Sequence, residues 1–490
     1  MTIAERPRFA AEVRTHTSFV NGRFEDEGGE PIEVRDPATW EVIGHIADAG
    51  EAGVDRAVRA AEAAFPAWRK TPVRERAAVI ERLADKLAEH ADEIARLDAL
   101  DTGNPLVAMR ADITKGIHQM HEAAGLAFEA KGETFPLPGL HYTAREPWGV
   151  VARLVTFNHP AMFTAARIAT ALVTGNTVII KPSELAPLSP LLIAELSAGI
   201  VPDGVINVVV GGPATGAAIA GHRSILRITF TGSTPTALRI QAAAAASGRV
   251  KSMTFELGGK NPIVVFPDVD LDETATAIVR GMNYARVQGQ SCGATSRLII
   301  HRSIADGVLE RVVERTRRIR IGMPSDPETE MGAMITRSAR GRVVDMVERA
   351  TADGARVLTG GHSIDDGELA AGAFLEPTVI DRVERGTELA DVEVFGPVLA
   401  ALTFEDEAEA VDLANDGPFG LTAAIWTQDI DRAFRVANAI DTGYVWINDV
   451  ETRFPAVPFG GWGDSGVGLE HGLDEVLSMT RIKAVNVRLR

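Results

Sequence analysis

The stretch Val150-Val151-Ala152-Arg153-Leu154-Val155-Thr156-Phe157 is almost continuously apolar and lacks the alternation of a strand with one wet face. Such a run is typical of a strand that is buried on both sides of a parallel sheet. Four similar runs follow, with room for a helix between most of them: residues 177–180, 205–210, 226–230 and 262–266. Strand and helix in alternation predict a mainly parallel, doubly wound α/β sheet.

The segments on either side of these runs predict helices and a second α/β region. Before residue 150, apolar residues recur at helical spacing in two segments: Val54, Val58, Ala61 and Phe65, and then Ile80, Leu83, Leu87, Ile94 and Leu97. Asp101-Thr102-Gly103 predicts a helix end. A second α/β region is expected from residue 283 to about residue 448.

Two further segments differ from this pattern. Residues 131–148 are rich in glycine and proline, and they predict either a linker or a hairpin that projects from the body. Residues 482–489 alternate in polarity, which predicts a terminal strand that needs a partner edge.

Length and composition limit the class of protein. A chain of 490 residues exceeds the usual size of one core, so two or more domains are expected. The net charge of −17 leaves no large basic surface for nucleic acid. The sequence contains no unbroken run of 18 apolar residues, so no membrane span is expected. Its charged start is unlike a secretory signal. A single cysteine excludes an intrachain disulfide and a cysteine-built metal site, so a cytoplasmic location is expected.

Three strand exits have the chemistry of a dinucleotide site, because backbone N–H groups point outward where a strand gives way to a helix. They are Lys181-Pro182-Ser183-Glu184, Gly211-Gly212-Pro213-Ala214-Thr215-Gly216 and Thr231-Gly232-Ser233-Thr234-Pro235. Each loop taken alone is equally consistent with a tight turn. Glu184 adds information, since a carboxylate there accepts hydrogen bonds from ribose hydroxyls and repels the 2′-phosphate of NADP.

Cys292, the only cysteine, lies in Gly289-Gln290-Ser291-Cys292-Gly293-Ala294. A lone cysteine often serves as a small buried hydrophobe. The small and polar neighbours here favour the approach of a ligand instead. A reactive thiolate needs an electropositive, partly open setting, and we expect a loop that leads into a helix N-terminus to provide it.

Two residues elsewhere are candidate partners of this cysteine. Glu256 is a charged residue inside the strand-like stretch Thr254-Phe255-Glu256-Leu257-Gly258-Gly259-Lys260. Asn158 follows the first strand, where its amide can donate to an oxyanion. The alternatives are that Glu256 forms a salt bridge and that Asn158 caps the next helix.

Together these segments resemble the NAD(P)-dependent aldehyde dehydrogenase superfamily over nearly the whole chain. The segments around Glu256 and Cys292 are similar to the family's glutamate and cysteine signatures. Further matches occur in the family's order, at Lys181-Pro182-Ser183-Glu184, Phe230-Thr231-Gly232-Ser233-Thr234, Glu393-Val394-Phe395-Gly396-Pro397 and Pro458-Phe459-Gly460-Gly461.

The resemblance implies an enzyme that oxidises an aldehyde to the carboxylic acid with NAD, with NADP the less favoured cofactor. Cys292 would attack the aldehyde, and Asn158 would stabilise the oxyanion of the thiohemiacetal together with the backbone N–H of Cys292. Hydride transfer would leave a thioester, which is hydrolysed by water that Glu256 activates. No metal is implied. The implied cofactor residues are Thr156, Phe157, Lys181, Ser183, Glu184, Gly216, Phe230, Thr231, Gly232, Ser233, Leu257, Glu393 and Phe395.

The resemblance also implies the fold: a Rossmann-like cofactor domain, an α/β catalytic domain and a small β oligomerisation hairpin. The cofactor domain would comprise residues 1–126 and 149–256, and the catalytic domain residues 257–460. Residues 127–148 and 478–490 would form oligomerisation elements, and 461–477 would return to the cofactor domain. A homodimer or homotetramer is implied.

The substrate pocket is expected to depart from the family pattern. His159 and Ala166 stand where many members have an aromatic residue and a tryptophan, and Arg453 lies in the variable stretch before Pro458. These differences predict a wide pocket that accepts a bulky or carboxylate-bearing aldehyde, unless Arg453 and Arg167 are solvated or salt-bridged. The expected pocket residues are His159, Phe163, Ala166, Ser291, Arg453 and Phe459.

Two other functions remain open on the sequence. A CoA-acylating dehydrogenase would share the cysteine but generally lacks a glutamate at the position of Glu256. A non-catalytic NAD-binding or structural protein would have no reason to keep Cys292, Glu256 and Asn158 together.

Overall fold

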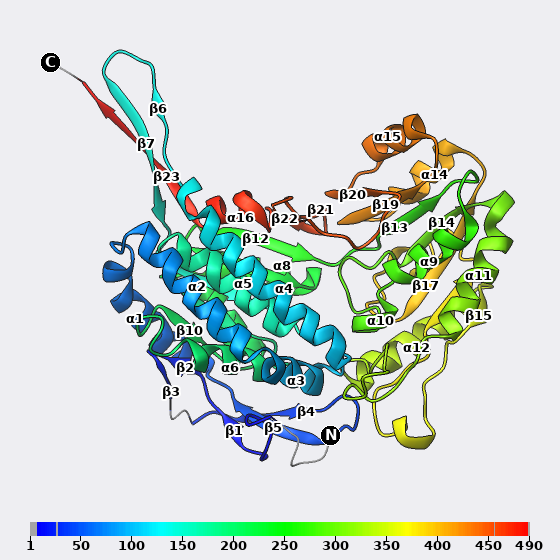
Figure 1. The fold of residues 1–490 in the computed structure, drawn as a ribbon, viewed down its shortest axis with the longest axis horizontal. Helices are drawn as coiled ribbons and strands as arrows, with labels where there is room; N and C mark the ends of the chain where they lie inside the picture. The colour runs from blue at the N-terminus through cyan, green and yellow to red at the C-terminus, as the bar shows by residue number, and fades with distance from the viewer. Residues whose placement is uncertain (1–6, 26–27, 455, 489–490) are drawn as a thin grey trace.

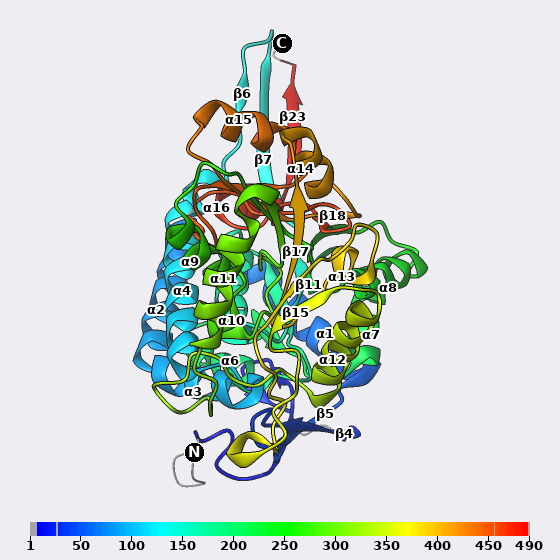
Figure 2. The same cartoon turned by 90° about the vertical axis from the view of Figure 1, so that its right-hand side faces the viewer.

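The computed structural model describes residues 7–25, 28–454 and 456–488. Two α/β halves lie side by side, and a narrow sheet made of β6, β7 and β23 projects from one of them, as Figure 1 shows. The same sheet stands clear of the body in the perpendicular view (Figure 2). None of the helices in the described ranges combines the length and the apolar composition that a membrane crossing needs.

Within the described residues, the first half is built on an eight-stranded sheet. The strands in spatial order are β22 (Gly466–Val467), β12 (Ser252–Leu257), β11 (Arg227–Gly232), β8 (Val150–Leu154), β9 (Thr177–Lys181), β10 (Ile206–Val208), β2 (Phe19–Val20) and β3 (Arg23–Phe24). From β12 to β10 the strands are parallel, while β22 and β2 pair antiparallel with their neighbours. The predicted parallel sheet is therefore confirmed, except that the run at 262–266 belongs to the second sheet.

Helices cover both faces of this sheet. One face packs against α2 (Val73–Glu89), α3 (Ala91–Thr102), α4 (Leu106–Gly125), α5 (Pro160–Val173) and α6 (Leu188–Ser197), and the other against α1 (Gly50–Trp68), α7 (Pro213–Gly221) and α8 (Thr234–Ala246). In β8, Val151 joins the first core, whereas Val150 and Ala152 join the second. Both faces being apolar explains the continuous hydrophobic run. The predicted helix end is also confirmed, because α3 stops at Thr102 before Gly103, whose φ is 77°.

Within the residues that the structure describes, the second half of the molecule is built on a seven-stranded sheet. Its strands in order are β15 (Arg356–Thr359), β16 (Thr378–Asp381), β17 (Val398–Phe404), β14 (Arg297–His301), β13 (Pro262–Val265), β19 (Thr422–Trp426) and β20 (Tyr444–Ile447). All neighbours are parallel except β15 and β16. The helices of this half are α9 (Leu271–Gly281), α10 (Tyr284–Val287), α11 (Ala305–Arg317), α12 (Arg337–Ala352), α13 (Glu388–Asp391), α14 (Glu407–Ala414) and α15 (Ile430–Ala439).

The projecting sheet has the order β23-β7-β6. It consists of β6 (Thr134–Phe135), β7 (Leu140–Pro147) and β23 (Thr480–Val487), and β23 runs antiparallel to β7 along its whole length. The glycine- and proline-rich segment is thus a hairpin rather than a linker, and the alternating tail is a strand; Leu489 of that tail lies outside the described residues.

The remaining elements are small. They are the sheet of β1 (Thr15–His16), β5 (Val42–Ala47) and β4 (Pro31–Arg35), the pair β18 (Phe419–Gly420) and β21 (Trp462–Gly463), the helix α16 (Gly472–Ser478), and 3₁₀ turns at Leu126–Glu129, Arg302–Ile304 and Gly367–Leu369.

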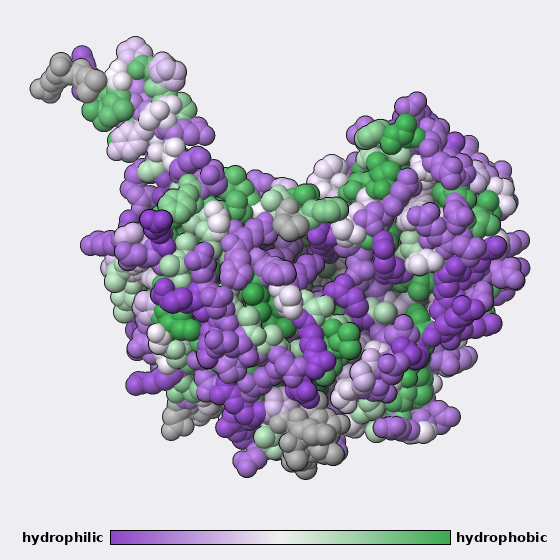
Figure 3. All heavy atoms as spheres, in the orientation of Figure 1, coloured by the Kyte–Doolittle hydropathy of each residue, from purple (hydrophilic) through white to green (hydrophobic). Residues whose placement is uncertain are grey.

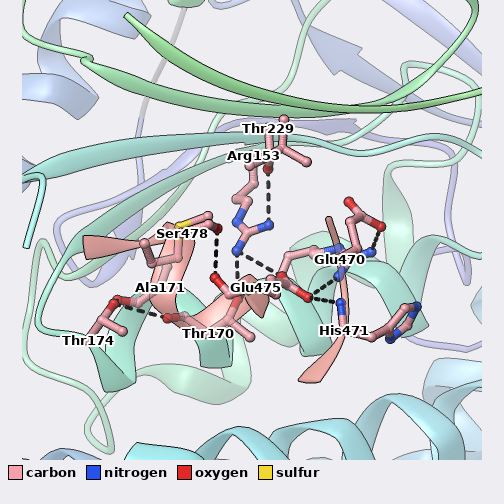
Figure 4. Close-up of polar contacts among 12 residues, drawn as sticks. Arg153, Thr170, Ala171, Thr174, Thr229, Glu470, His471, Glu475 and Ser478 are labelled. Carbon is pink, nitrogen blue, oxygen red and sulfur yellow. Dashed lines mark hydrogen bonds and ion pairs between the residues drawn. The ribbon is translucent and has the colours of Figure 1, made fainter. Parts of the chain in front are cut away.

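A buried ionic network ties α16 to the first sheet (Figure 4). The carboxylate of Glu475 accepts hydrogen bonds from Arg153 on β8 (3.0 Å) and from Arg167 on α5 (2.8 Å). It also accepts one from Thr170 (3.0 Å) and one from the backbone N–H of His471 (2.8 Å). Although burial alone raises it, the two arginine charges hold the pKa of Glu475 below its usual range. Glu475 therefore bridges two buried arginines, and Glu470, which forms a further ion pair with Arg167, supplies the second negative charge.

Glu475→Gln should destabilise the protein strongly, because it leaves Arg153 and Arg167 buried with too little negative charge. The expected loss is about 3–5 kcal/mol of unfolding free energy, measured as an earlier midpoint in urea. The exposed pair of Glu407 and Arg435 supplies the control: Glu407→Gln should leave the midpoint nearly unchanged. Equal midpoints for the two variants would contradict the assignment.

Candidate active site

The three strand exits singled out in the sequence meet in one cavity of about 540 Å³. They meet because the carboxyl ends of parallel strands lie at the same edge of a sheet. Its volume falls within the range of small-molecule and cofactor sites. Eight of the thirteen expected cofactor residues line it: Thr156, Lys181, Ser183, Glu184, Gly216, Phe230, Thr231 and Gly232.

One end of this cavity is charged and the walls are apolar. The Lys181 ammonium lies 3.6 Å from the Glu184 carboxylate and donates to the carbonyl of Pro182 (3.0 Å). Burial lowers the pKa of Lys181. Leu154, Ala217 and Ile240 provide apolar surface. A flat apolar group such as adenine fits between such walls, with ribose hydroxyls near Glu184, so the residues present suit a dinucleotide.

The other five expected cofactor residues lie outside this cavity. Ser233 precedes α8, and its hydroxyl donates to the hydroxyl of Thr236 (3.0 Å). Phe157 and Phe395 make an edge-to-face ring contact, with centroids 5.8 Å apart. Leu257 ends β12 and is buried.

Glu393 reaches the first half from a loop of the second. Its carboxylate accepts a hydrogen bond from the backbone N–H of Gly259 (3.1 Å). It lies so close to Gly258 that a Cβ there would require the Glu393 side chain to move. Burial raises the pKa of Glu393 to about 7. The end of β12 is therefore where the two halves of the molecule meet.

Cys292 lies in a turn that leads into strand β14, so the expected helix N-terminus after it is wrong. An amide holds the turn instead: Nδ2 of Asn261 donates to the carbonyls of Cys292 (2.7 Å) and Ala294 (2.9 Å), and its Oδ1 accepts from the N–H of Thr422 (3.1 Å). The backbone of Cys292 is thereby fixed to β13 and β19.

Glu256 lies on β12 facing Cys292, and only 2% of its surface is exposed. Among the described residues its carboxylate forms no salt bridge, so the salt-bridge alternative is wrong, and the polar group that it meets is the thiol of Cys292. Burial, and after it the negative charge of Glu470, raise the pKa of Glu256 to about 7. A carboxylate with that pKa can accept a proton near neutrality.

The thiol of Cys292 is not activated by its surroundings alone. Burial and the negative charge of Glu256 raise its pKa well above the ordinary value, while the Arg453 guanidinium opposes this shift. The thiol and the carboxyl therefore compete for one negative charge. Moving the thiol proton to Glu256 would keep one charge in the site, which is the arrangement of a nucleophile beside a base.

Asn158 also lies at this site. Its Nδ2 donates to the carbonyl of Gln290 (2.8 Å), two residues before Cys292, and its own carbonyl accepts from Asn104 (3.0 Å). The cap of α5 is His159, without a side-chain cap, so the alternative that Asn158 caps this helix is wrong.

Two cavities lead to Cys292. The inner cavity, of about 50 Å³, is lined by His159, Phe163, Ser291, Cys292 and Arg453, among others. The outer cavity, of about 370 Å³, includes Arg453 and Phe459. Ala166 lies two helical turns beyond His159 on α5 and lines a small cavity beside Glu475. This cavity shares Gln119, Glu122 and His471 with the outer cavity, and the role of Ala166 in the substrate pocket stays a prediction.

Arg167 and Arg453, whose pairing the sequence did not decide, have different partners in the structure. Arg167 is salt-bridged, to Glu470 and Glu475 in the buried network. Arg453 instead lies with its guanidinium 3.9 Å from the centroid of the Phe459 ring and against Gly293. It therefore stands at the boundary between the inner and outer cavities.

The sequence reasoning missed four polar residues of the site. Asp112 and Lys115 lie on α4, and Arg286 lies in the segment before Cys292. A charged residue within the apolar side of a helix was the available signal for Asp112, which is fully buried. Asn261 directly follows the glutamate segment, and its position at the start of a buried strand was a comparable signal.

Comparisons with known proteins agree with this geometry. A profile of the Aldehyde dehydrogenase family matches residues 24–485. The chain is 42% identical to Aldehyde dehydrogenase tropH of Talaromyces stipitatus, over 97% of this chain and 93% of that one.

Solved structures give the same result. PnpE from Pseudomonas sp. WBC-3, determined with nicotinamide adenine dinucleotide, is 39% identical with a TM-score of 0.93, covering 97% of this chain and 98% of that one. Betaine aldehyde dehydrogenase from Staphylococcus aureus, determined with NAD+, is 33% identical with a TM-score of 0.93, covering 96% and 95%.

Glu256→Gln should lower the pKa of the Cys292 thiol, because it removes the negative charge that opposes the thiolate. The measurement is the pH dependence of alkylation by iodoacetamide, which reports on one thiol since the chain has a single cysteine. The midpoint should move to lower pH in the variant. Glu184→Gln, which changes a carboxylate of the proposed cofactor cavity, is the control and should leave the midpoint in place. An upward shift or no shift in Glu256→Gln would refute the effect of the Glu256 charge on the Cys292 thiol.

Proposed function

The chain belongs to the aldehyde dehydrogenase family and is an NAD-dependent enzyme, and we propose that it oxidises its aldehyde to the carboxylic acid through a covalent bond to Cys292. The observation that carries this proposal is the buried carboxylate of Glu256, which forms no salt bridge among the described residues and interacts with the thiol of the only cysteine. A buried carboxylate without a cationic partner is costly unless it has a task.

Each residue has a separate chemical role in this proposal. Glu256 takes the thiol proton of Cys292, and the thiolate attacks the aldehyde carbon to form a thiohemiacetal. The amide of Asn158, with the backbone N–H of Cys292, donates to the oxyanion. NAD accepts the hydride that leaves the former aldehyde carbon. After Glu256 has released the thiol proton to solvent, its carboxylate removes a proton from the water that hydrolyses the thioester on Cys292.

The negative charge of Glu184, in the cavity where the three strand exits meet, supports NAD over NADP as the cofactor. Glu184 can accept hydrogen bonds from both ribose hydroxyls, whereas a 2′-phosphate at the same place would meet its negative charge. Lys181 is already engaged with Glu184 and Pro182. Equal kcat/KM values for the two cofactors would refute this preference.

Glu256 also supports hydrolysis over transfer of the acyl group to CoA. Water needs a base to attack a thioester at neutral pH, and a buried carboxylate with a pKa of about 7 supplies one. A non-catalytic role is disfavoured because Glu256 and Asn158 approach the Cys292 segment from different elements: Glu256 interacts with the thiol, and the Asn158 amide donates to the carbonyl of Gln290.

The projecting sheet supports assembly into a homodimer or homotetramer. Its strands β6 and β23 are edges, and edge strands offer unpaired backbone groups to another chain. Apolar side chains lie on it (Figure 3), where a monomer would leave them in water: Phe135, Leu137, Leu140, Tyr142 and Ile482.

Removing the nucleophile and removing the base should have different kinetic signatures. Cys292→Ala should form no NADH from any aldehyde. Glu256→Gln should still release up to one NADH per site in a first turnover, while its steady-state rate falls by roughly 10²–10⁴-fold, the usual contribution of a general base. Stopped-flow NADH absorbance distinguishes the two; persistent turnover in Cys292→Ala would refute the mechanism, and a CoA thioester as product would refute hydrolysis.

Charges on the projecting sheet should break the assembly. Leu140→Asp combined with Ile482→Asp places two carboxylates on the exposed apolar surface, and the mass in solution, measured by light scattering after size-exclusion chromatography, should fall to that of one chain. Ile430→Asp is the matched control, because Ile430 is as exposed but lies on α15 in the other half. An unchanged mass in the double variant would count against assembly through this sheet.

A further inference from the structure

The cavities that lead to Cys292 are lined by acidic and basic side chains in unequal states of pairing. The acidic groups that line these cavities are engaged, while Glu256 and Glu470, whose negative charges also act on Arg453, lie outside the linings. Asp112 accepts from His159 (2.5 Å) and from Arg286 (2.9 Å), and Glu451 forms an ion pair with Arg286. The carboxylate of Glu122 in the outer cavity accepts from the backbone N–H of Ala456 (2.7 Å).

Two basic side chains line the same cavities without an ion pair of this kind among the described residues. Lys115 and Arg453 each line both cavities, so they stand where the inner cavity opens into the outer one. Among the described residues neither forms a salt bridge with a carboxylate. Burial, and after it the positive charges of Arg453 and Arg286, lower the pKa of Lys115 to about 8. The three cationic side chains therefore repel one another.

The position of Arg453 is set by the surrounding structure. Its guanidinium lies over the ring of Phe459, which is 1% exposed and therefore rigidly packed. The preceding residue pair is held from both sides: Arg286 binds Glu451, and the indole N–H of Trp446 donates to the carbonyl of Thr452 (2.6 Å). A preorganised cation of this kind costs little to position when a ligand arrives.

We propose that this site takes an aldehyde that also carries a carboxylate, which is held between Lys115 and Arg453 while the aldehyde group reaches Cys292. The substrate assignment rests on the proposed function. An anion there would receive charge-assisted hydrogen bonds from both groups in a largely buried setting, where they are stronger than in water. The substrate is therefore an acid semialdehyde as a chemical class.

The sizes of the two cavities agree with this arrangement. The inner cavity, at about 50 Å³, has room for little more than an aldehyde group. The outer cavity, at about 370 Å³, has room for the rest of a chain of several carbons, against Tyr444, Phe454 and Val457. The carboxylate would lie at the boundary between them, a short distance from the aldehyde group, and any further part of the substrate would extend into the outer cavity.

The first test does not depend on aldehyde oxidation. Iodoacetate and iodoacetamide are nearly equal in size and both form an S–C bond at the Cys292 thiolate with loss of iodide, but only iodoacetate carries a carboxylate. In the wild-type full-length protein, the ratio of their rate constants should exceed that of a free thiol such as N-acetylcysteine by about tenfold, since nearby cations attract the anionic reagent. The thiolate fraction cancels in this ratio.

Variants of Lys115 locate the effect. Lys115→Met should lower the iodoacetate preference by about threefold or more, and Lys115→Arg, which keeps the charge, should retain most of it. Lys70→Met removes an exposed lysine just after α1 and should leave the ratio unchanged. A wild-type ratio no higher than that of the free thiol, or an equal ratio in Lys115→Met, would overturn the anion site.

The second test addresses the substrate. The ratio of kcat/KM for an aldehyde with a terminal carboxylate to that for its methyl ester should exceed one in the wild type and fall in Lys115→Met and Arg453→Ala, mainly through KM. Oxidation of both compounds with no preference would overturn the substrate class and leave the proposed function standing. NADH formation with neither would overturn the proposed function, while the alkylation ratio would still report on the anion site.

Discussion

Two arginines, Arg153 and Arg167, are buried inside the first half of the molecule, and the carboxylate of Glu475 forms an ion pair with both. A buried charge without its partner is strongly destabilising, so α16 cannot leave the first sheet without a large cost. The segment before α16 is held with it. Its strand β22 pairs with β12, where Gly466 is the register partner of Glu256. The ionic network thus fixes the neighbours of the base.

The same segment brings a second carboxylate toward the site. Glu470 is bound to Arg167 in the network, and its negative charge raises the pKa of Glu256. Burial has the larger effect, but the two act in the same direction. The scaffold that stabilises the fold therefore also contributes to the protonation behaviour of the base. Structure and chemistry are coupled here through electrostatics at short range in a medium of low polarity.

The proposed catalytic groups come from both halves of the molecule. Asn158 and Glu256 follow or end strands of the first sheet, while Cys292 precedes β14 of the second and is held by Asn261. Gly258 lies at the junction, where Glu393 of the second half packs directly against it. A site at such a junction depends on how two cores are oriented, which many distributed contacts decide together.

The sequence by itself determined the parallel strands of the first sheet and the candidates for the reacting groups. Strands buried on both faces produce continuous apolar runs, as in β8, and a single thiol beside small residues makes Cys292 the predicted nucleophile. The tertiary structure decided the rest, because local patterns do not specify distant partners. Only folding showed that Arg167 is neutralised while Arg453 is not, that the turn of Cys292 leads into a strand, and that Lys115 on α4 reaches the cavity before Cys292. Pairing between side chains far apart in the chain depends on how layers pack, and one sequence carries no local signal for that.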